Sequence, residues 1–399
     1  MNGTTPAPPP PYLVYDRLRA ARPIHWGYPG AWFLTRHRDC TAVLRDPRFS
    51  SDARNSDLYH SRLRSTPAAV RDLVAPRAGR AMVFTDPPDH PRLRQPLQHA
   101  FSSRTVTAMR RRIQRTADEL LGRIASGGAA RVDLVEDYAF PLSVAVVCDL
   151  LAVPAEDRAL LRTLSSGVIP TLDPALDTAT VSRGNQAGAA LYQFFGRLLE
   201  TRQTLPPRND LLGTLLAARN HGQIDHGELI ALCVLLVVAG QETTGNLIAN
   251  GLYTLLHAPQ ELARLRRHPQ FLPGAVEELL RYESPVQMTS RTALEDITLD
   301  GVRIRRGQQV IAVIGAVNRD PGRFTDPHRL DLSRTPNRHL AFGSGPHFCL
   351  GAQLARAEAH IAIGTLLRRF PVLKPDGDPP SWRGAMSIRG LEHLPVTLG

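Results

Sequence analysis

The sequence of 399 residues is 43% hydrophobic, which is ample for a large core, and no long low-complexity linker divides it, so one domain spanning residues 1–399 is predicted. The net charge of +11 suggests nucleic acid, but the arginines are spread along helical segments without a nucleic-acid motif, which argues against that partner. Four cysteines without C-x-x-C spacing, no secretory pattern, and a longest apolar run of 11 residues (Leu229 to Ala239) predict a soluble, cytoplasmic protein without a membrane span.

The N-terminal part predicts a small sheet with helices. Met1 to Pro11 is rich in proline and predicts a flexible arm. Tyr12 to Ala21 and Arg36 to Leu44 predict helices, and the aromatic content of Ile24 to Leu34 predicts a hairpin. Asp46 to Gly79 has no sustained periodicity and predicts a long irregular loop, which is unusual enough to suggest function.

The next segments are mostly helical. Asp86 before a proline is typical of a helix start and places His90 and Arg94, four residues apart, on one face, for which a solvated basic face is the simplest interpretation. From Thr105 to the mid-150s the pattern is helical. It includes the basic cluster Met109 to Arg112, interpreted as a solvated face or as a dock for an acidic electron carrier. Val168 to Val181 predicts a mobile lid between two helices.

The longest predicted helix runs from about Asp225 to His257. Asp225 and Glu228 form a capping-box pattern, and the helix would be roughly 48 Å long, enough to cross a domain. Within it, the glycine and adjacent threonines of Ala239 to Thr244 weaken regular helical geometry, so a polar kink is the simplest interpretation.

Glu278 and Arg281 form an acid-base pair three residues apart on another predicted helix. Alone this signal is weak, because exposed pairs of this kind contribute only about 0.2 to 0.5 kcal/mol. Pro285 ends the helix and leads into a strand-rich segment that extends through Val313.

The segment Phe342 to Gly351 surrounds Cys349 with three glycines and a proline, and Ala352 to Leu367 has helical periodicity. A thiolate just before a helix gains from the N-terminal dipole and from unpaired backbone N–H groups, which predicts a lowered pKa for Cys349. The alternative is that Cys349 is a small buried apolar residue, which is common for free cysteine.

The spacing Phe-x-x-Gly-x-x-x-Cys-x-Gly strongly resembles the haem-binding loop of the cytochrome P450 family, and the motifs at 239–244, 278–281 and 90–94 have the order of that family. The resemblance implies a mainly α fold with small β-sheets, a triangular prism with a long central helix over haem b. Cys349 would be the axial iron ligand. The cofactor-binding residues implied by the resemblance are Cys349, His90, Arg94, Arg291, His347, Phe342, Gly343, Gly351, Ala239 and Gly240.

The resemblance also assigns roles near the haem. Thr243 would hydrogen-bond to oxygen at the haem, and Glu242 would help protons reach it. Glu278, Arg281 and Arg334 would form a buried ionic triad that serves the structure and not the chemistry. The positions implied for substrate contacts are Leu235, Val238, Ala239, Gln287, Met288, Ser387 and Ile388.

The function implied is a monooxygenase that inserts one atom of O2 into an apolar small molecule by hydroxylation or epoxidation, as a tailoring step in secondary-metabolite biosynthesis. The chain has no G-x-G-x-x-G fingerprint, so electrons would come from a ferredoxin and its reductase, and the enzyme would be a monomer. The alternatives are a haem-thiolate protein that binds or isomerises a ligand without activating O2, and a peroxide-using hydroxylase.

Overall fold

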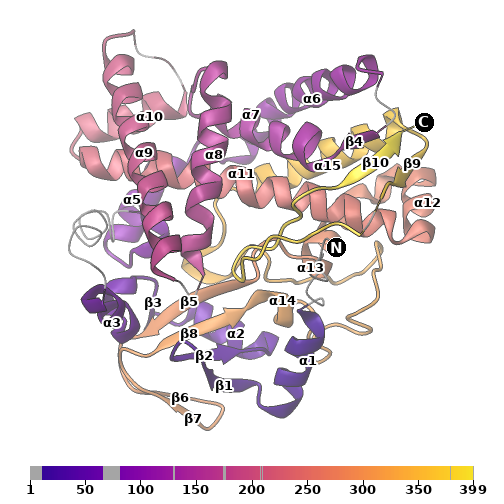
Figure 1. Ribbon diagram of the computed structural model, residues 1–399. Helices are drawn as coiled ribbons and strands as arrows, with labels where there is room; N and C mark the ends of the chain where they lie inside the picture. Colours follow the sequence, from indigo (N-terminus) through magenta and orange to yellow (C-terminus); the bar gives the residue numbers. More distant parts are fainter. Residues whose placement is uncertain are drawn as a thin grey trace.

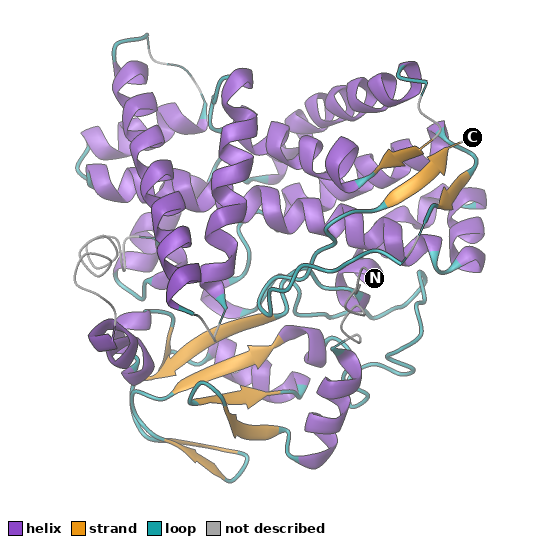
Figure 2. Cartoon of the chain, in the orientation of Figure 1, coloured by secondary structure: helices purple, strands orange, loops and turns teal. Residues whose placement is uncertain are grey.

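The computed structural model describes residues 11–65, 81–128, 131–173, 177–206, 208, 210–377 and 379–398. Helices dominate these ranges, and strands form small sheets at two opposite corners (Figure 2), so the prediction of a mainly α fold with small β-sheets is confirmed. The predicted arm 1–11, except its last residue, and the part of the predicted loop beyond residue 65 lie outside the described residues.

The larger sheet has the strand order β1-β2-β8-β5-β3, with β2 and β8 parallel and the other neighbours antiparallel. Its strands are β1 (Ile24–Gly27), β2 (Ala31–Leu34), β3 (Phe49–Ser50), β5 (Met288–Ala293) and β8 (Gln309–Val313). The sheet therefore joins the N-terminal part to residues about 280 positions later. The short helices α1 (Tyr12–Ala21), α2 (His37–Arg45) and α14 (Ile314–Val317) lie beside it (Figure 1).

Two smaller sheets complete the strands. The hairpin of β6 (Ile297–Leu299) and β7 (Val302–Ile304) extends from the lower edge of the molecule in Figure 1. The three-stranded sheet has the order β4-β10-β9, from β4 (Arg131–Asp133), β10 (Pro395–Leu398) and β9 (Leu373–Pro375).

The remaining helices form the larger part of the molecule. They are α3 (Asp57–Ser65), α5 (Asp89–Gln98), α6 (Ser103–Ser126), α7 (Phe140–Leu150), α8 (Arg158–Val168), α9 (Thr178–Gln203), α10 (Leu211–Asn220), α11 (His226–Leu256), α12 (Pro259–Arg267), α13 (Leu272–Tyr282) and α15 (Ala352–Arg369). In Figure 1, α11 crosses the middle of the molecule above the larger sheet, and α8 and α9 cross it steeply, extending both above and below it. A core cluster of buried side chains links α11 to α6, α7, α13 and α15.

Helix α11 begins as the sequence predicts. Asp225 accepts a hydrogen bond from the backbone N–H of Glu228 and Glu228 accepts one from that of Asp225, which completes the capping box. The helix is continuous through Ala239 to Thr244, so the predicted weakening does not interrupt it. By length and composition α11 could span a membrane, but 56% of its most apolar window is buried inside the protein, as in the core helix of a soluble protein.

Most of the predicted elements are present, with two corrections. The helix Tyr12–Ala21, the hairpin and the helix at 37–45 are confirmed. The predicted helical stretch from Thr105 is interrupted, because β4 pairs with β10 at the far end of the chain. The predicted irregular loop contains α3, a short helix with few apolar residues and therefore little periodicity. In the segment predicted as a lid, a short 3₁₀ turn, Ile169–Leu172, directly follows α8. Residues 174–176 of this segment lie outside the described residues.

Candidate active site

The loop before α15 folds tightly around Cys349. Gly343 and Gly345 have φ angles of +72°, which non-glycine residues rarely adopt. A Cβ on Gly345 would lie 2.5 Å from the carbonyl oxygen of Leu44, so this glycine also permits a close backbone contact. The backbone N–H of Cys349 donates to the carbonyl of Phe342 at 2.9 Å, which closes the loop. These constraints place the thiol three residues before the first residue of α15.

Cys349 differs from the other cysteines in its exposure. Cys40, Cys148 and Cys233 are buried, whereas Cys349 is partly exposed. The surrounding protein raises the pKa of the Cys349 thiol, while the N–H of Gly351 and two arginines act in the opposite direction. The prediction of a lowered pKa is therefore wrong for the protein alone, because desolvation outweighs the loop's donors. Ionisation needs a further positive charge at the sulfur, which a metal ion supplies.

Four basic side chains from three elements gather beside this loop. His90 and Arg94 lie on α5, Arg291 lies on β5, and His347 lies in the loop itself. The rings of His90 and His347 are 4.0 Å apart, and Arg94 Nη2 donates to the carbonyl of Phe348 at 2.8 Å. The structure therefore brings together four residues that are separated by up to 257 positions in the sequence.

These four basic side chains have no acidic partner among the described residues. No carboxylate lies within ion-pair distance of any of the four, and the Asp86 carboxylate that acts on Arg291 accepts hydrogen bonds from the Ser50 hydroxyl and the Ser51 N–H instead. Burial lowers the pKa of Arg291 to about 10. Burial and then the cation of Arg291 lower the pKa of His347 to about 3.

Two arginine cations gathered without an acid, one of them buried, are unfavourable unless an anion binds there. The Nε2 atom of His90 is also buried without a partner in the described part of the chain. Two carboxylates next to the thiol would pair with the unpaired cations and would give His90 Nε2 a hydrogen-bond partner. Haem supplies this combination, an iron for the thiolate and two propionates for the cations, so the residues present fit the cofactor.

Helix α11 has one stripe of exposed residues in the middle of the protein, which indicates an internal space beside it, called the cavity below. Leu235, Ala239 and Thr243 are spaced four residues apart and are partly or fully exposed, whereas most of the surrounding helix is buried. The Thr243 hydroxyl donates to the carbonyl of Ala239 at 2.7 Å. A Cβ on Gly240 would lie 3.0 Å from a methyl group of Val147, so this glycine allows close packing against α7.

Glu242 lies on a different side of α11 from Thr243. Its side chain is fully buried, and Arg383 Nη1 donates to its Oε2 at 2.9 Å. The Ser166 hydroxyl donates to its Oε1. No local pattern indicates these two partners, because they lie 141 and 76 positions from Glu242 on other elements.

Glu278, Arg281 and Arg334 meet in the interior. Arg281 donates twice to the Glu278 carboxylate, both at 2.7 Å, and Arg334 Nε lies 3.1 and 3.2 Å from its two oxygens. The first two side chains are fully buried. Asn337 and the backbone N–H of Asp331 also donate to Glu278, two contacts that the motif does not indicate.

Two of the predicted substrate contacts have their polar atoms engaged elsewhere. Gln287 is buried, donates to the carbonyl of Ser284 at 2.7 Å and accepts from Tyr15 at 3.3 Å. The Ser387 hydroxyl donates to the carbonyl of Leu172 at 2.8 Å. Their side chains therefore serve the structure around the cavity.

The apolar candidates lie on three segments. Leu235, Val238 and Ala239 lie on α11, and Met288 is partly exposed on β5. Ile388 lies in the C-terminal segment and pairs with Val286 in an isolated bridge. The available lining is thus mainly apolar.

Two surface hollows lie outside this region. One, of about 670 Å³, is lined by Arg110, Arg111, Gln114 and Arg115 of α6 with Ile361 of α15. The predicted basic cluster needs one correction here, because Arg112 is paired with Asp149 at 2.6 Å.

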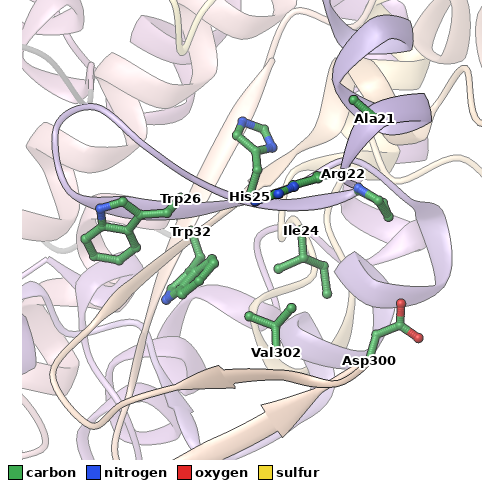
Figure 3. A pocket seen from close by; sticks show the side chains of 9 residues that line it. Ala21, Arg22, Ile24, His25, Trp26, Trp32, Asp300 and Val302 are labelled. Carbon is green, nitrogen blue, oxygen red and sulfur yellow. The ribbon is translucent and has the colours of Figure 1, made fainter.

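The second hollow, of about 600 Å³, lies beside the β1–β2 hairpin and β7 (Figure 3). Trp26 and Trp32 line it with an edge-to-face contact of 5.1 Å, and its acid, Asp300, is paired with Arg36 and Arg38. It contains neither the thiol nor the unpaired cations.

Comparisons with known proteins agree with this geometry. A sequence model described as "Cytochrome P450" matches residues 169–390. The chain is 39% identical to the biotin biosynthesis cytochrome P450 of Bacillus subtilis, over 97% of this chain and 96% of that protein. It is 36% identical to the 6-deoxyerythronolide B hydroxylase of Saccharopolyspora erythraea, over 97% and 96% of the two chains. The crystal structure of P450BioI in complex with a hexadec-9Z-enoic acid ligated acyl carrier protein superposes with a TM-score of 0.90 at 38% identity, covering 98% of both chains.

Proposed function

The chain belongs to the cytochrome P450 family, whose cofactor is haem, and from this we propose that it inserts one atom of O2 into an apolar small molecule as a tailoring step in secondary-metabolite biosynthesis. The observation that carries the proposal is the set of four basic side chains without acids beside a partly exposed thiol. Haem, when bound, supplies the activation of O2.

The haem-binding roles follow from the charges of the site. Cys349 would be the axial ligand, and His90, Arg94, Arg291 and His347 would bind the propionates. The other proposed contacts are Phe342, Gly343, Gly351, Ala239 and Gly240. Phe342 stacks under the Arg356 guanidinium at 4.5 Å, which fixes the start of the loop.

The chemistry on the opposite side of the cavity is assigned to α11. Thr243 has the only side-chain hydroxyl on the exposed stripe Leu235, Ala239 and Thr243 of this helix. We assign it the role of holding a proton by hydrogen bonding at the cavity, with Glu242 as the proton source. These roles distinguish an oxygenase from a protein that only binds or isomerises a ligand.

The substrate is proposed to be apolar and to contact Leu235, Val238, Ala239, Met288 and Ile388, with Gln287 and Ser387 supporting the wall from behind. A polyketide-like or acyl substrate fits these contacts, and the names of two relatives refer to such molecules. The substrate is either free or attached to a carrier protein, as in the complex of P450BioI.

The electron donor is proposed to be a ferredoxin with its reductase, acting in the cytoplasm. Arg110, Arg111 and Arg115 have no acidic partner within ion-pair distance among the described residues and line an open hollow. Such a surface favours encounter with an acidic protein. The proposed enzyme is a monomer that binds no nucleic acid.

The test begins with the holoenzyme. Reduced protein with carbon monoxide should show the red-shifted Soret band of thiolate-ligated haem, and Cys349→Ser should abolish it; a variant that keeps both the band and activity would remove the ligand assignment. With a plant-type ferredoxin, its reductase and hexadec-9-enoic acid, free or carrier-bound, O2 consumption with an oxygenated product supports the monooxygenase. Product formed only with hydrogen peroxide would favour the peroxide-using hydroxylase.

A further inference from the structure

Glu242 and Thr243 are neighbours in sequence but face different surroundings. Successive residues of a helix are separated by about 100°, so their side chains do not face each other. Thr243 is partly exposed along the cavity stripe, whereas the Glu242 side chain has no exposed surface. The carboxylate is therefore not at the cavity, and a proton that it carries must be taken up elsewhere.

Arg383 connects the buried carboxylate to solvent. Its side chain is 27% exposed, and its Nη1 atom donates to Glu242 at 2.9 Å. The guanidinium also lies over the ring of Phe140, 4.7 Å from the centroid, which fixes its direction. A fully buried carboxylate needs such a partner, because an unpaired buried charge is strongly unfavourable.

The polar face of α11 continues past Glu242 under the C-terminal segment. Asn246, one turn further, has both side-chain polar atoms buried without a partner among the described residues. Gly390 covers it so closely that a Cβ there would lie 2.0 Å from Asn246 Oδ1. In the next turn the Asn250 side-chain amide donates to the carbonyl of Arg389 at 3.0 Å, and its Oδ1 atom is buried without a partner in the described chain. Buried polar atoms of this kind are typical positions for bound water.

We propose, resting on the monooxygenase function above, that Arg383 is the positioning residue for Glu242, holding its carboxylate beneath the C-terminal segment so that Glu242 takes up protons on that side of α11. The proton adds to a carboxylate oxygen of Glu242. The neutral acid no longer carries the charge that binds it to Arg383, and it turns toward Thr243 by also giving up the hydrogen bond from the Ser166 hydroxyl. Arg383 thus determines on which side of α11 Glu242 takes up its proton, and protonation of Glu242 breaks the ion pair.

Arg162 provides a matched control. Its guanidinium lies over the same Phe140 ring at 5.1 Å, and its side chain is 25% exposed, close to the value for Arg383. Its ion-pair partner is Glu136 and not Glu242. Arg162→Met therefore removes a cation of the same kind from the same aromatic ring without touching the proposed proton carrier.

The experiment uses haem-loaded protein, a plant-type ferredoxin, its reductase and hexadec-9-enoic acid, and measures O2 consumption in H2O and D2O. Glu242→Gln should slow it about 100-fold. Arg383→Met should slow it about tenfold with a larger solvent isotope effect, and Arg383→Lys should recover most of the rate. The double variant Arg383→Met, Glu242→Gln should be no slower than Glu242→Gln, because Arg383 acts through Glu242. Arg162→Met should match the wild type.

Thermal unfolding of the same proteins gives a readout that is independent of activity. Arg383→Met should lower the melting temperature by about 4 °C when Glu242 is present and much less with Glu242→Gln, because a neutral amide needs no cation. A wild type that consumes no O2 would remove the proposed function. If the wild type consumes O2, two results would overturn the role of Arg383 without affecting the proposed function. One is an Arg383→Met protein with unchanged rate and isotope effect. The other is a double variant in which the rate losses of the two single variants multiply.

Discussion

Replacing Arg281 by methionine should destabilise the protein far more than replacing its neighbour Arg334. Arg281 is fully buried and makes two hydrogen bonds of 2.7 Å to Glu278. It also donates to the carbonyls of Asn318, Pro327 and Arg329 at 2.9, 2.8 and 3.2 Å. Methionine preserves much of the volume but removes the charge and all five donated bonds.

The expected magnitude follows from what remains around Glu278. Removing one partner of a buried ion pair costs about 3 to 5 kcal/mol. Arg334 remains, but its contacts to Glu278 are longer and its side chain is 10% exposed. The buried carbonyls of Asn318 and Pro327 also lose this donor, so Arg281→Met should lie near the upper end of that range. Arg334→Met should cost about 1 to 2 kcal/mol, because Glu278 keeps both bonds from Arg281.

The assay is denaturant unfolding of the haem-loaded protein, followed by circular dichroism and by haem absorbance. Arg264→Met on α12 is the control, since Arg264 is one-third exposed and lies 3.6 and 3.9 Å from its two acids. Such a surface pair contributes about 0 to 1 kcal/mol. Equal losses for Arg281→Met and Arg264→Met would refute the reasoning from burial.

Three further variants test the haem site and its support. Thr243→Ala should keep haem and substrate binding but release more hydrogen peroxide per reducing equivalent, measured together with product; unchanged coupling would contradict the role of its hydroxyl. Arg291→Met should transfer haem to apomyoglobin about tenfold faster, because a charge-assisted contact is lost; an unchanged rate would mean that Arg291 does not bind the cofactor. Burial alone would raise the pKa of Glu277, but the hydrogen bonds led by Arg356 lower it to about 2. The stabilisation of the folded state by ionised Glu277 is complete above its unfolded pKa of 4.5. As the pH falls toward 2, the free energy of unfolding therefore decreases by about 3 kcal/mol. Glu277→Gln should flatten that part of the stability curve, and an identical acid transition in both proteins would exclude the pair as its cause.

The elements that sequence predicts correctly are those specified by local chemistry. The capping box of Asp225 and Glu228 sets the start of α11, and the aromatic content of Ile24 to Leu34 indicates the hairpin. Strand β4 could not be predicted in this way, because three residues become a strand only through pairing with β10, more than 260 positions away. Helix α3 has too few apolar residues to show a period.

In the candidate site, too, the features set by local motifs could be predicted from the sequence, and those set by the whole fold could not. The loop around Cys349 and the stripe of Thr243 are local motifs, and the sequence alone places them. The direction of the pKa of Cys349 depends on the summed burial by the whole protein, so local reasoning about the helix dipole gave the wrong sign. The pairing of Glu242 with Arg383 likewise depends on how the C-terminal segment returns over α11.

The net charge of +11 can be interpreted only when the basic residues that pair with acids are distinguished from those that do not. Many arginines, such as Arg281 and Arg112, are neutralised by acids within the protein. Two groups stand out among the basic residues that have no acidic partner in the described part of the chain: the four basic side chains beside Cys349, and Arg110, Arg111 and Arg115 on α6. In the first group His90 and Arg291 are buried and Arg94 and His347 are partly buried, so an anion that enters the protein, as haem propionates would, can compensate it. The second group is exposed, so it attracts an anionic surface at long range and tolerates water without one. The same excess charge therefore holds a cofactor in one place and, in our proposal, guides an electron donor in the other.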